Sequence, residues 1–170
     1  MIVNTRHFGK MDIEEDRIIR FPNGLIAFHN IKNYFIIERE DKKFPVCYLQ
    51  AIDEPDLAFV IINPFLINPD YDFDIPPGDV EELGIEKESD VAVFSILVVP
   101  EDVTKMTANL LAPLVINAKK KIGKQIVLQD RRYSTRHLVL DEIREIRGEG
   151  RNNAGANQEK ERKHHDRRRN

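Results

Sequence analysis

Few residues of the chain could perform covalent chemistry, and their surroundings do not support it. A catalytic nucleophile needs a base within hydrogen-bond reach and a third group that orients this base. Ser89 lies in a charged turn, whereas Ser95 lies within the most apolar stretch of the chain. Cys47 also stands in an apolar run, so we interpret it as a small core residue and not as a reactive thiol. The sequence therefore predicts no catalytic residues and a protein that is not an enzyme.

The histidines do not form a metal-binding pattern. His7, His29 and His137 are scattered singly, without the spacing that places two ligands on one face of a helix or in a zinc knuckle. His164 and His165 are adjacent, but they lie in a charged tail, where we interpret them as a solvated pair. We therefore expect no bound metal.

Phosphate and calcium loops are also excluded by the sequence. Gly123-Lys124 is followed by Gln125 where a phosphate loop needs Ser or Thr, and no Gly stands five residues earlier. The acidic residues of the stretch 72–82 could suggest a calcium loop, but Pro76-Pro77 interrupts the regular order of its ligands. We therefore expect no cofactor.

Charge is divided unevenly along the chain. Residues 147–170 hold 8 Lys and Arg against 4 Asp and Glu, which leaves 18 basic and 25 acidic residues in residues 1–146. The body therefore carries a net charge of −7 and the tail +4. An acidic body disfavours nonspecific nucleic-acid binding and favours a basic protein partner. The tail lacks large apolar residues, so we predict that it is disordered.

Length and composition predict one cytoplasmic domain over residues 1–146. A chain of 170 residues has the length of a single domain and can bury a core of its own. The single cysteine excludes an intramolecular disulfide, and the first residues lack the pattern of a signal peptide. The apolar stretches fall far short of the roughly 20 residues that span a bilayer. We expect no membrane association and a monomer when no partner is bound.

Short apolar or alternating runs recur between turn residues, which is typical of an antiparallel sheet or barrel. They occupy residues 9–14, 17–21, 34–38, 46–50, 57–62, 91–99, 114–116 and 125–128. A short link joins the alternating runs 10–14 and 17–21, so we expect these two strands to pair as a hairpin. The run 91–99 is apolar on both faces, so we expect a strand that is covered from both sides at the centre of the core.

Helix signals are few. Asp79 could cap a helix over residues 80–83 that ends at Gly84 in a left-handed conformation. Leu140, Ile143 and Ile146 share one face of a second helix, and we favour its docking on the barrel over a role in partner binding. The predicted fold is therefore mainly β: a small antiparallel β-barrel-like single domain with one or two short helices and a disordered C-terminal tail.

Several motifs, in this order along the chain, resemble the FliW family of flagellar assembly factors. They are Phe21-x-x-Gly24-Leu25-x-x-Phe28, Leu49-Gln50, Leu57-Ala58-Phe59 with Asn63-Pro64, Leu83-Gly84 with Asp90-Val91, Thr107-Ala108-Asn109-Leu110-x-Ala112-Pro113-x-Val115-Ile116-Asn117, Gly123-Lys124-Gln125 and Tyr133-x-Thr135-Arg136-His137. Together they cover almost the whole predicted domain. The family usually has Gly where Ala27 stands, and because Ala is also small we expect no change in the fold.

The resemblance implies a non-enzymatic β protein that binds two partners in alternation, flagellin and the RNA-binding translational regulator CsrA. In this scheme cytoplasmic flagellin holds the protein. Export of flagellin frees it to capture CsrA, which relieves the repression of flagellin mRNA translation. The acidic body fits a basic RNA-binding partner, and a strand-rich domain offers edges and grooves for a terminal helix of flagellin.

The candidate contact residues include the segment that follows the last predicted strand. Tyr133, Arg136 and His137 lie between this strand and the terminal helix, and Tyr and Arg are common at interface hot spots. Asn109 and Asn117 flank another predicted strand. Their amides can bond to nearby backbone, so we favour a structural role for them over partner contact.

A lysine-rich stretch, residues 119–124, lies between two apolar runs and is predicted to be the tip of a hairpin. Lys121 and Lys124 in this tip could bind a partner, or they could simply keep the tip solvated. A second function therefore stays open, namely RNA binding through the hairpin tip and the Arg-rich tail, although direct nucleic-acid binding by the body is not expected.

Overall fold

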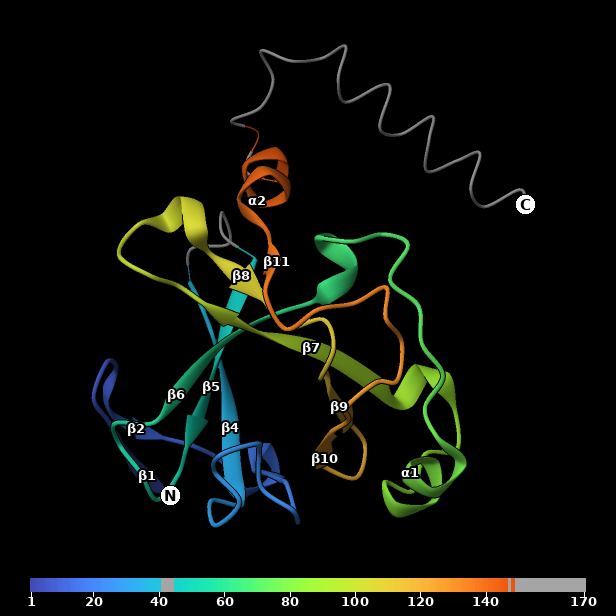
Figure 1. Cartoon of the computed structure of the whole chain (residues 1–170). Helices are drawn as coiled ribbons and strands as arrows, with labels where there is room; N and C mark the ends of the chain where they lie inside the picture. Colours follow the sequence, from blue (N-terminus) through green and yellow to red (C-terminus); the bar gives the residue numbers. More distant parts are fainter. Residues whose placement is uncertain (41–44, 147, 149–170) are drawn as a thin grey trace.

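The computed structural model describes residues 1–40, 45–146 and 148, and most of its strands belong to one closed barrel (Figure 1). The strands in the described residues are β1 Ile2–Thr5, β2 Gly9–Asp12, β3 Ile19–Arg20, β4 Asn33–Glu38, β5 Val46–Ala51, β6 Ala58–Ile62, β7 Val91–Val98, β8 Thr107–Ala108, β9 Leu114–Asn117, β10 Ile122–Gln125 and β11 His137–Leu138.

The barrel runs in the order β3-β4-β5-β6-β7-β9-β10 and closes where β10 returns to β3. The pairing between β10 and β3 is parallel, and the other barrel pairings are antiparallel. β8 and β11 extend the sheet from the end of β7, and β1 and β2 form a separate hairpin. The prediction of a mainly β, barrel-like fold is confirmed.

Side chains from the barrel strands and from the loop after β3 fill the interior of the barrel. Phe21, Tyr34 and Leu49 are each 0% exposed, and the rings of Phe21 and Tyr34 meet edge to face at 5.5 Å. The Phe21 ring lies against Gly123 of β10, where an added Cβ would come within 2.6 Å of a ring carbon. Gly123 therefore leaves the space that this ring occupies.

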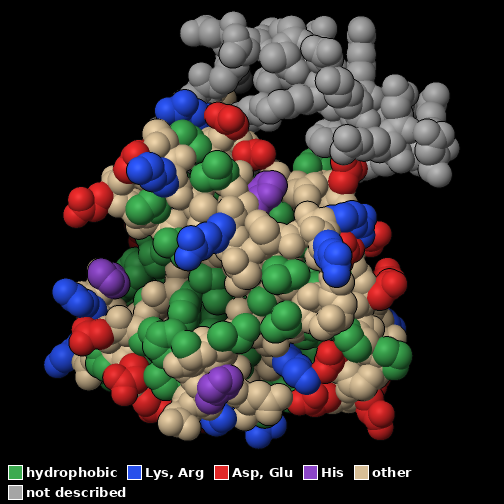
Figure 2. All heavy atoms as spheres, viewed as in Figure 1, with side chains coloured by type: hydrophobic (Ala, Val, Ile, Leu, Met, Phe, Trp, Pro, Cys, Tyr) green, Lys and Arg blue, Asp and Glu red, His purple; other side chains and the backbone are tan. Residues whose placement is uncertain are grey.

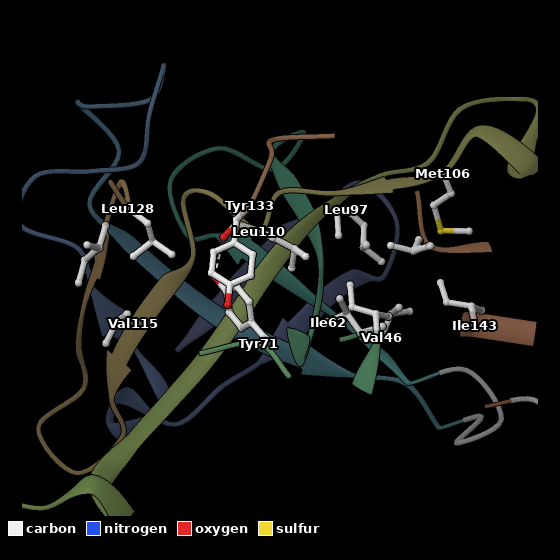
Figure 3. Close-up of a cluster of buried hydrophobic side chains, with 14 of the residues drawn as sticks. Val46, Ile62, Tyr71, Leu97, Met106, Leu110, Val115, Leu128, Tyr133 and Ile143 are labelled. Carbon is white, nitrogen blue, oxygen red and sulfur yellow. Dashed lines mark hydrogen bonds between the residues drawn. The ribbon is translucent and has the colours of Figure 1, made fainter. Parts of the chain in front are cut away.

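A second buried cluster covers the outside of the barrel (Figure 3). It packs strand residues such as Ile62 and Leu97 against the connecting segments 67–75 and 126–143. Tyr71 and Tyr133 meet in this cluster with their ring centroids 4.7 Å apart. These segments contain little regular secondary structure, so the cluster is what fixes them against the barrel.

Both predicted helices are present. They are α1 Pro77–Glu82 and α2 Leu140–Ile146, and the described residues also contain the 3-10 turns η1 Glu15–Arg17, η2 Pro64–Leu66, η3 Glu88–Asp90 and η4 Val103–Lys105. α1 begins earlier than predicted, so Asp79 lies in its first turn and its side chain does not cap the helix. The left-handed end at Gly84 is confirmed by a φ of 62°. The docking of α2 is also confirmed, because Ile143 is 2% exposed within the outer cluster.

The predicted hairpin between residues 10–14 and 17–21 is wrong. β2 pairs with β1, a strand that the sequence did not indicate, whereas β3 pairs with β4 and β10. The β1–β2 turn is held by Thr5, whose hydroxyl accepts a hydrogen bond from Phe8 N at 2.9 Å and donates one to Gly9 O at 2.8 Å. The 3-10 turn η1 occupies the short link, so the chain leaves the plane of β2 before β3 begins.

Two other strand predictions are confirmed only in part. Both faces of β7 pack against buried clusters, with Leu97 in the outer cluster and Phe94 and Ile96 against the interior one, but Val98 at its end is 60% exposed. The run 125–128 contributes only Gln125 to β10, which starts at Ile122. The hairpin of β9 and β10 is confirmed, but its turn is residues 118–121, and Lys124 lies in the strand.

The predicted disordered tail falls on residues 147 and 149–170, which lie outside the described residues, so this prediction and the domain boundary at residue 146 stay predictions. Within the described part of the chain, no helix is long and apolar enough to cross a membrane.

Candidate partner-binding surfaces

The hydroxyl of Tyr133 is directed into the protein. Tyr133 is 8% exposed, and its Oη accepts a hydrogen bond from Asp72 N at 2.9 Å and donates one to Asp72 O at 3.0 Å. The Arg132 guanidinium lies 5.1 Å from the centre of the Tyr133 ring. It also forms a salt bridge with Asp130, with Nη2 2.6 Å from Oδ2. This pairing lowers the pKa of the Asp130 carboxyl. Tyr133 therefore holds the segment 70–75 in place. The neighbouring charged side chains of Arg132 and Asp130, and not its hydroxyl, face the solvent.

Arg136 and His137 follow on the same segment. Arg136 is exposed, and its backbone N–H donates to Ser134 Oγ at 3.3 Å. His137 begins β11 opposite Ala108 of β8, and its Nε2 is buried without a hydrogen-bond partner among the described residues. Arg136 thus offers its whole head group to a partner, whereas His137 offers only part of its ring.

The two asparagines bond to backbone, as the structural interpretation requires. Asn109 Oδ1 accepts a hydrogen bond from Ala112 N at 2.9 Å. Asn117 is 1% exposed, and its Nδ2 donates to Leu83 O at 2.9 Å and to Gly84 O at 3.1 Å. Its Oδ1 accepts from the backbone N–H groups of Lys119 and Lys120, each at 3.1 Å. Asn117 therefore joins the end of α1 to the β9–β10 turn from inside the protein.

The lysines of the β9–β10 hairpin lie beside the acidic helix α1. Lys124 Nζ is 2.6 Å from Asp79 Oδ1 and 2.8 Å from Glu82 Oε2, and these hydrogen bonds raise the pKa of Lys124. Lys120 Nζ lies 3.7 Å from Glu86 Oε1. Lys121 is exposed with a φ of 55°, and its carbonyl accepts from Arg20 N at 3.0 Å. Part of the basic charge of the tip is therefore neutralised within the protein.

The structure brings the candidate residues together in two places. Asn109 lies close to the segment 133–137, because Leu110 N donates to Ser134 O at 3.0 Å. An open cleft of about 420 Å³ borders this segment between Asp72–Asp74 and residues 128–132. Asn117, Lys121 and Lys124 lie instead beside α1. A smaller cleft of about 250 Å³ at this place is lined by Arg20, Lys120 and Lys121 together with acidic residues of α1. Which of these surfaces contacts a partner stays a prediction.

The sequence analysis missed an apolar surface on the barrel itself. Several inward-facing side chains of β4 to β7 are only partly buried, and they include Ile36, Cys47, Phe59 and Ile96. Figure 2 shows hydrophobic side chains gathered in the middle of the face of the molecule that is drawn there. We call these four residues the apolar mouth. One feature of the sequence could have indicated this surface, namely the run 91–99. It is apolar on both faces, but only part of it is buried in the structure.

Metal ligands do not converge in the described part of the chain, where no group of three or more His, Cys, Asp or Glu could hold a metal ion. Cys47 lies in the apolar mouth, and burial, with a smaller effect of the Glu38 carboxylate, raises the pKa of its thiol. A raised pKa lowers the thiolate fraction near neutral pH and so disfavours nucleophilic chemistry.

Comparison with known proteins identifies close relatives. The family model described as FliW protein matches residues 2–139. The flagellar assembly factor FliW of Alkaliphilus metalliredigens is 50% identical over 146 residues, which cover 86% of this chain and 90% of that protein. The factor of Bacillus subtilis is 38% identical over 139 residues, which cover 82% of this chain and 96% of that protein. A crystal structure of a flagellar assembly factor FliW superposes with a TM-score of 0.76 at 37% identity, covering 82% of this chain and 96% of that one.

Proposed function

Because the chain belongs to the FliW family of flagellar assembly factors, we propose that it acts in the cytoplasm without catalysis, by binding flagellin and the translational regulator CsrA in alternation. Flagellin in the cytoplasm occupies the protein. When flagellin is exported, the freed protein binds CsrA and relieves the repression of flagellin mRNA translation. The observation that carries this proposal is the family match over residues 2–139, which includes every strand of the barrel.

The charge of the folded body supports a basic partner. Residues 1–146 carry a net charge of −7, and an RNA-binding regulator must present basic residues to its RNA. Complementary charge accelerates encounter and becomes weaker as salt increases. Binding to CsrA should therefore slow in high salt mainly through its association rate.

A co-elution experiment tests the proposal. The purified full-length chain is mixed with flagellin and with CsrA of the same organism, separately and together, and passed over a size-exclusion column. We expect a complex with each partner and displacement of CsrA when flagellin is in excess. If the chain forms a complex with neither flagellin nor CsrA, the proposal is refuted.

The alternative function, RNA binding, loses part of its support at the hairpin tip. Lys124 is held by two carboxylates and Lys120 lies near a third, so fewer free cations are available for phosphate contacts. The alternative then depends on the tail, residues 147–170. If it holds, RNA affinity should fall steeply with salt and should be lost when the tail is deleted, whereas a truncated chain with unchanged RNA affinity would contradict it.

A further inference from the structure

Two segments without regular secondary structure form the walls of the cleft beside Tyr133. One wall is the segment 72–74 and the other is the segment 128–132, and together they border a volume of about 420 Å³. Figure 1 shows the green segment that leads into α1 running beside the orange segment that leads into β11. Neither wall belongs to a strand of the barrel. The cleft therefore lies between two stretches of chain that are not joined as a sheet.

The backbone of both walls carries groups that are open to a ligand. Tyr133 Oη accepts a hydrogen bond from Asp72 N and donates one to Asp72 O, which holds one end of the cleft. In the described part of the chain, no hydrogen bond engages the backbone N–H and C=O groups of Phe73 and Asp74 on one wall or of Gln129 on the other. Such groups are strong donors and acceptors. They can therefore bind the backbone of another chain.

The wall 72–74 continues into two prolines, which favour an extended backbone. Pro76 has a φ of −53° and a ψ of 142°, and proline also disfavours the helical region for the residue before it, here Ile75. Phe73 anchors this wall, because it packs against the outer cluster with its ring centroid 5.4 Å from that of Tyr71. The wall therefore presents a fixed edge of backbone, much as the outermost strand of a sheet does.

An extended polypeptide fits the cleft better than other ligands. A strand offers free backbone N–H and C=O groups to a neighbouring chain, whereas a helix has already used its own. A small molecule is usually enclosed by its pocket over most of its surface, but this cleft is open. Its lining includes the carboxylates of Asp72, Asp74 and Asp130, which disfavour the phosphates of a nucleic acid. The cleft therefore suits a segment of a protein chain that lies along it.

The side chains of the cleft indicate what such a segment carries. Phe73 is partly buried and Leu128 is 8% exposed, so both offer apolar surface. Asp74 on one wall and Arg131 on the other are exposed, and neither forms a salt bridge with a described residue. Opposite charges on the two walls favour a segment that carries both an acidic and a basic residue beside an apolar one.

We propose that this cleft binds an extended segment of a protein partner, whose backbone pairs with residues 73–75 as an added strand. The segment places an apolar side chain on Phe73 and Leu128. A basic side chain of the segment lies near Asp74 and an acidic one near Arg131. The inference rests on the proposed function in that a protein partner exists, and it deepens that function by assigning a surface and a mode of binding.

Amide hydrogen exchange measured by NMR tests the pairing residue by residue. The N–H groups of residues 73–75 have no partner among the described residues, so they should exchange fast in the free chain. We expect flagellin or CsrA to slow this exchange at least about tenfold when present at about 100 times Kd. Successive N–H groups of a strand point to opposite sides, so the slowing should appear at Asp74 alone or at Phe73 and Ile75. The unpaired N–H groups of Glu101 and Asp102 are the control and should keep their rates.

A synthetic peptide tests the cleft without either protein. Its sequence alternates Val with Lys and Glu. The control peptide has the same sequence but is N-methylated throughout, so that it keeps its side chains and has no backbone donor. We expect only the first peptide to slow the exchange of residues 73–75, in the same alternating pattern. Equal slowing by the N-methylated peptide would contradict backbone pairing.

Charge reversal separates the cleft from the general charge of the body. Arg131→Glu should weaken binding of the first peptide about fivefold, whereas Arg6→Glu changes the net charge equally on the β1–β2 turn and should have little effect. Both side chains are exposed, so both variants should fold. Equal weakening by the two variants would contradict a defined site.

These readouts keep the inference distinct from the proposed function. If flagellin or CsrA co-elutes with the chain but leaves the exchange of residues 73–75 unchanged, the proposed function stands and the cleft is not the docking site. If neither protein binds but the first peptide gives the alternating protection, the cleft stands as a peptide site and the proposed function fails. Exchange that no ligand slows overturns the inference.

Discussion

Two substitutions in the loop that contains the turn at residues 25–28 should change the free energy of unfolding in opposite directions. Leu25 and Phe28 form an isolated bridge, with Phe28 N donating to Leu25 O at 2.8 Å, and Ala27 between them has a φ of 70°. A left-handed conformation costs a residue with a Cβ about 1–2 kcal/mol. Glycine avoids this cost but loses about 0.4–1 kcal/mol more entropy on folding. Because Ala27 is exposed and its methyl group packs little, Ala27→Gly should raise the free energy of unfolding by about 0.5–1 kcal/mol.

Gly24→Ala in the same loop is the matched control. Gly24 also has a positive φ of 64°, but an added Cβ would lie 2.5 Å from Phe28 O and 2.6 Å from the Cα of His29. These are backbone atoms that cannot move without breaking the turn. We expect a loss of about 3 kcal/mol, from the left-handed conformation and the displaced backbone together.

Urea denaturation measures both variants against the parent chain. The chain has no Trp, so far-ultraviolet circular dichroism or tyrosine fluorescence must follow unfolding. Ala27→Gly should move the midpoint to higher urea without a change in the slope, and should raise Tm by roughly 1–4 °C. A lower midpoint for Ala27→Gly, or an unchanged midpoint for Gly24→Ala, would refute the reasoning.

Three further changes can be measured in the same way. Gly123→Ala would place a Cβ within 2.6 Å of the Phe21 ring and should cost about 1–3 kcal/mol; an unchanged midpoint would mean that the ring can move aside. Lys124→Met leaves Asp79 unpaired and should cost about 1 kcal/mol in low salt, with a smaller difference from the parent in high salt. Tyr34→Phe removes a buried hydroxyl that has no partner among the described residues, so it should be neutral or stabilising near neutral pH. Burial raises the pKa of Tyr34 from 10.0 to about 12, so the unfolded state ionises first and the parent loses stability as pH rises from about 10 to about 12. Tyr34→Phe should lose less over that range, and equal alkaline losses would contradict this account.

The strands of the barrel could be predicted to a large extent because their signal is local. Alternation and turn residues located β4, β5 and β6 within a residue or two. The pairing of β3 with β10 and of β7 with β9 could not be predicted in this way, since it joins residues that are far apart in sequence. The predicted hairpin failed for the same reason, as it assigned β3 to its nearest neighbour in the chain.

Ala27 shows how a correct observation can receive the wrong physical reason. The resemblance to the family implies Gly at this position, and the sequence analysis took small size as the property that Ala shares with Gly. The φ of 70° shows that the relevant property is conformational, and Ala does not share it. A backbone dihedral in a loop leaves no periodic pattern, so the sequence alone could not distinguish the two explanations.

The candidate contact residues show that the prediction of function from the sequence is limited in a similar way. Tyr133 was selected because Tyr is common at interfaces, but its hydroxyl bonds to the backbone of Asp72, and this could not be inferred without the segment 70–75 beside it. Lys124 was selected as part of a basic tip, but α1 provides carboxylates that neutralise it. Residue type predicts which side chains can make contacts, whereas the fold decides which of them are already engaged within the protein.

The proposed alternation between flagellin and CsrA places a condition on the surfaces that bind them. Two ligands exclude each other either because their sites overlap or because each stabilises a different state of the protein. The second route needs an element with two arrangements. In the described residues, however, the barrel is closed by strand pairing, and interior side chains such as Phe21, Tyr34 and Leu49 are 0% exposed. Overlap of the two binding sites is therefore the simpler route. It predicts that no ternary complex elutes from a size-exclusion column when both partners are present. A stable ternary complex would instead place the two partners on separate surfaces.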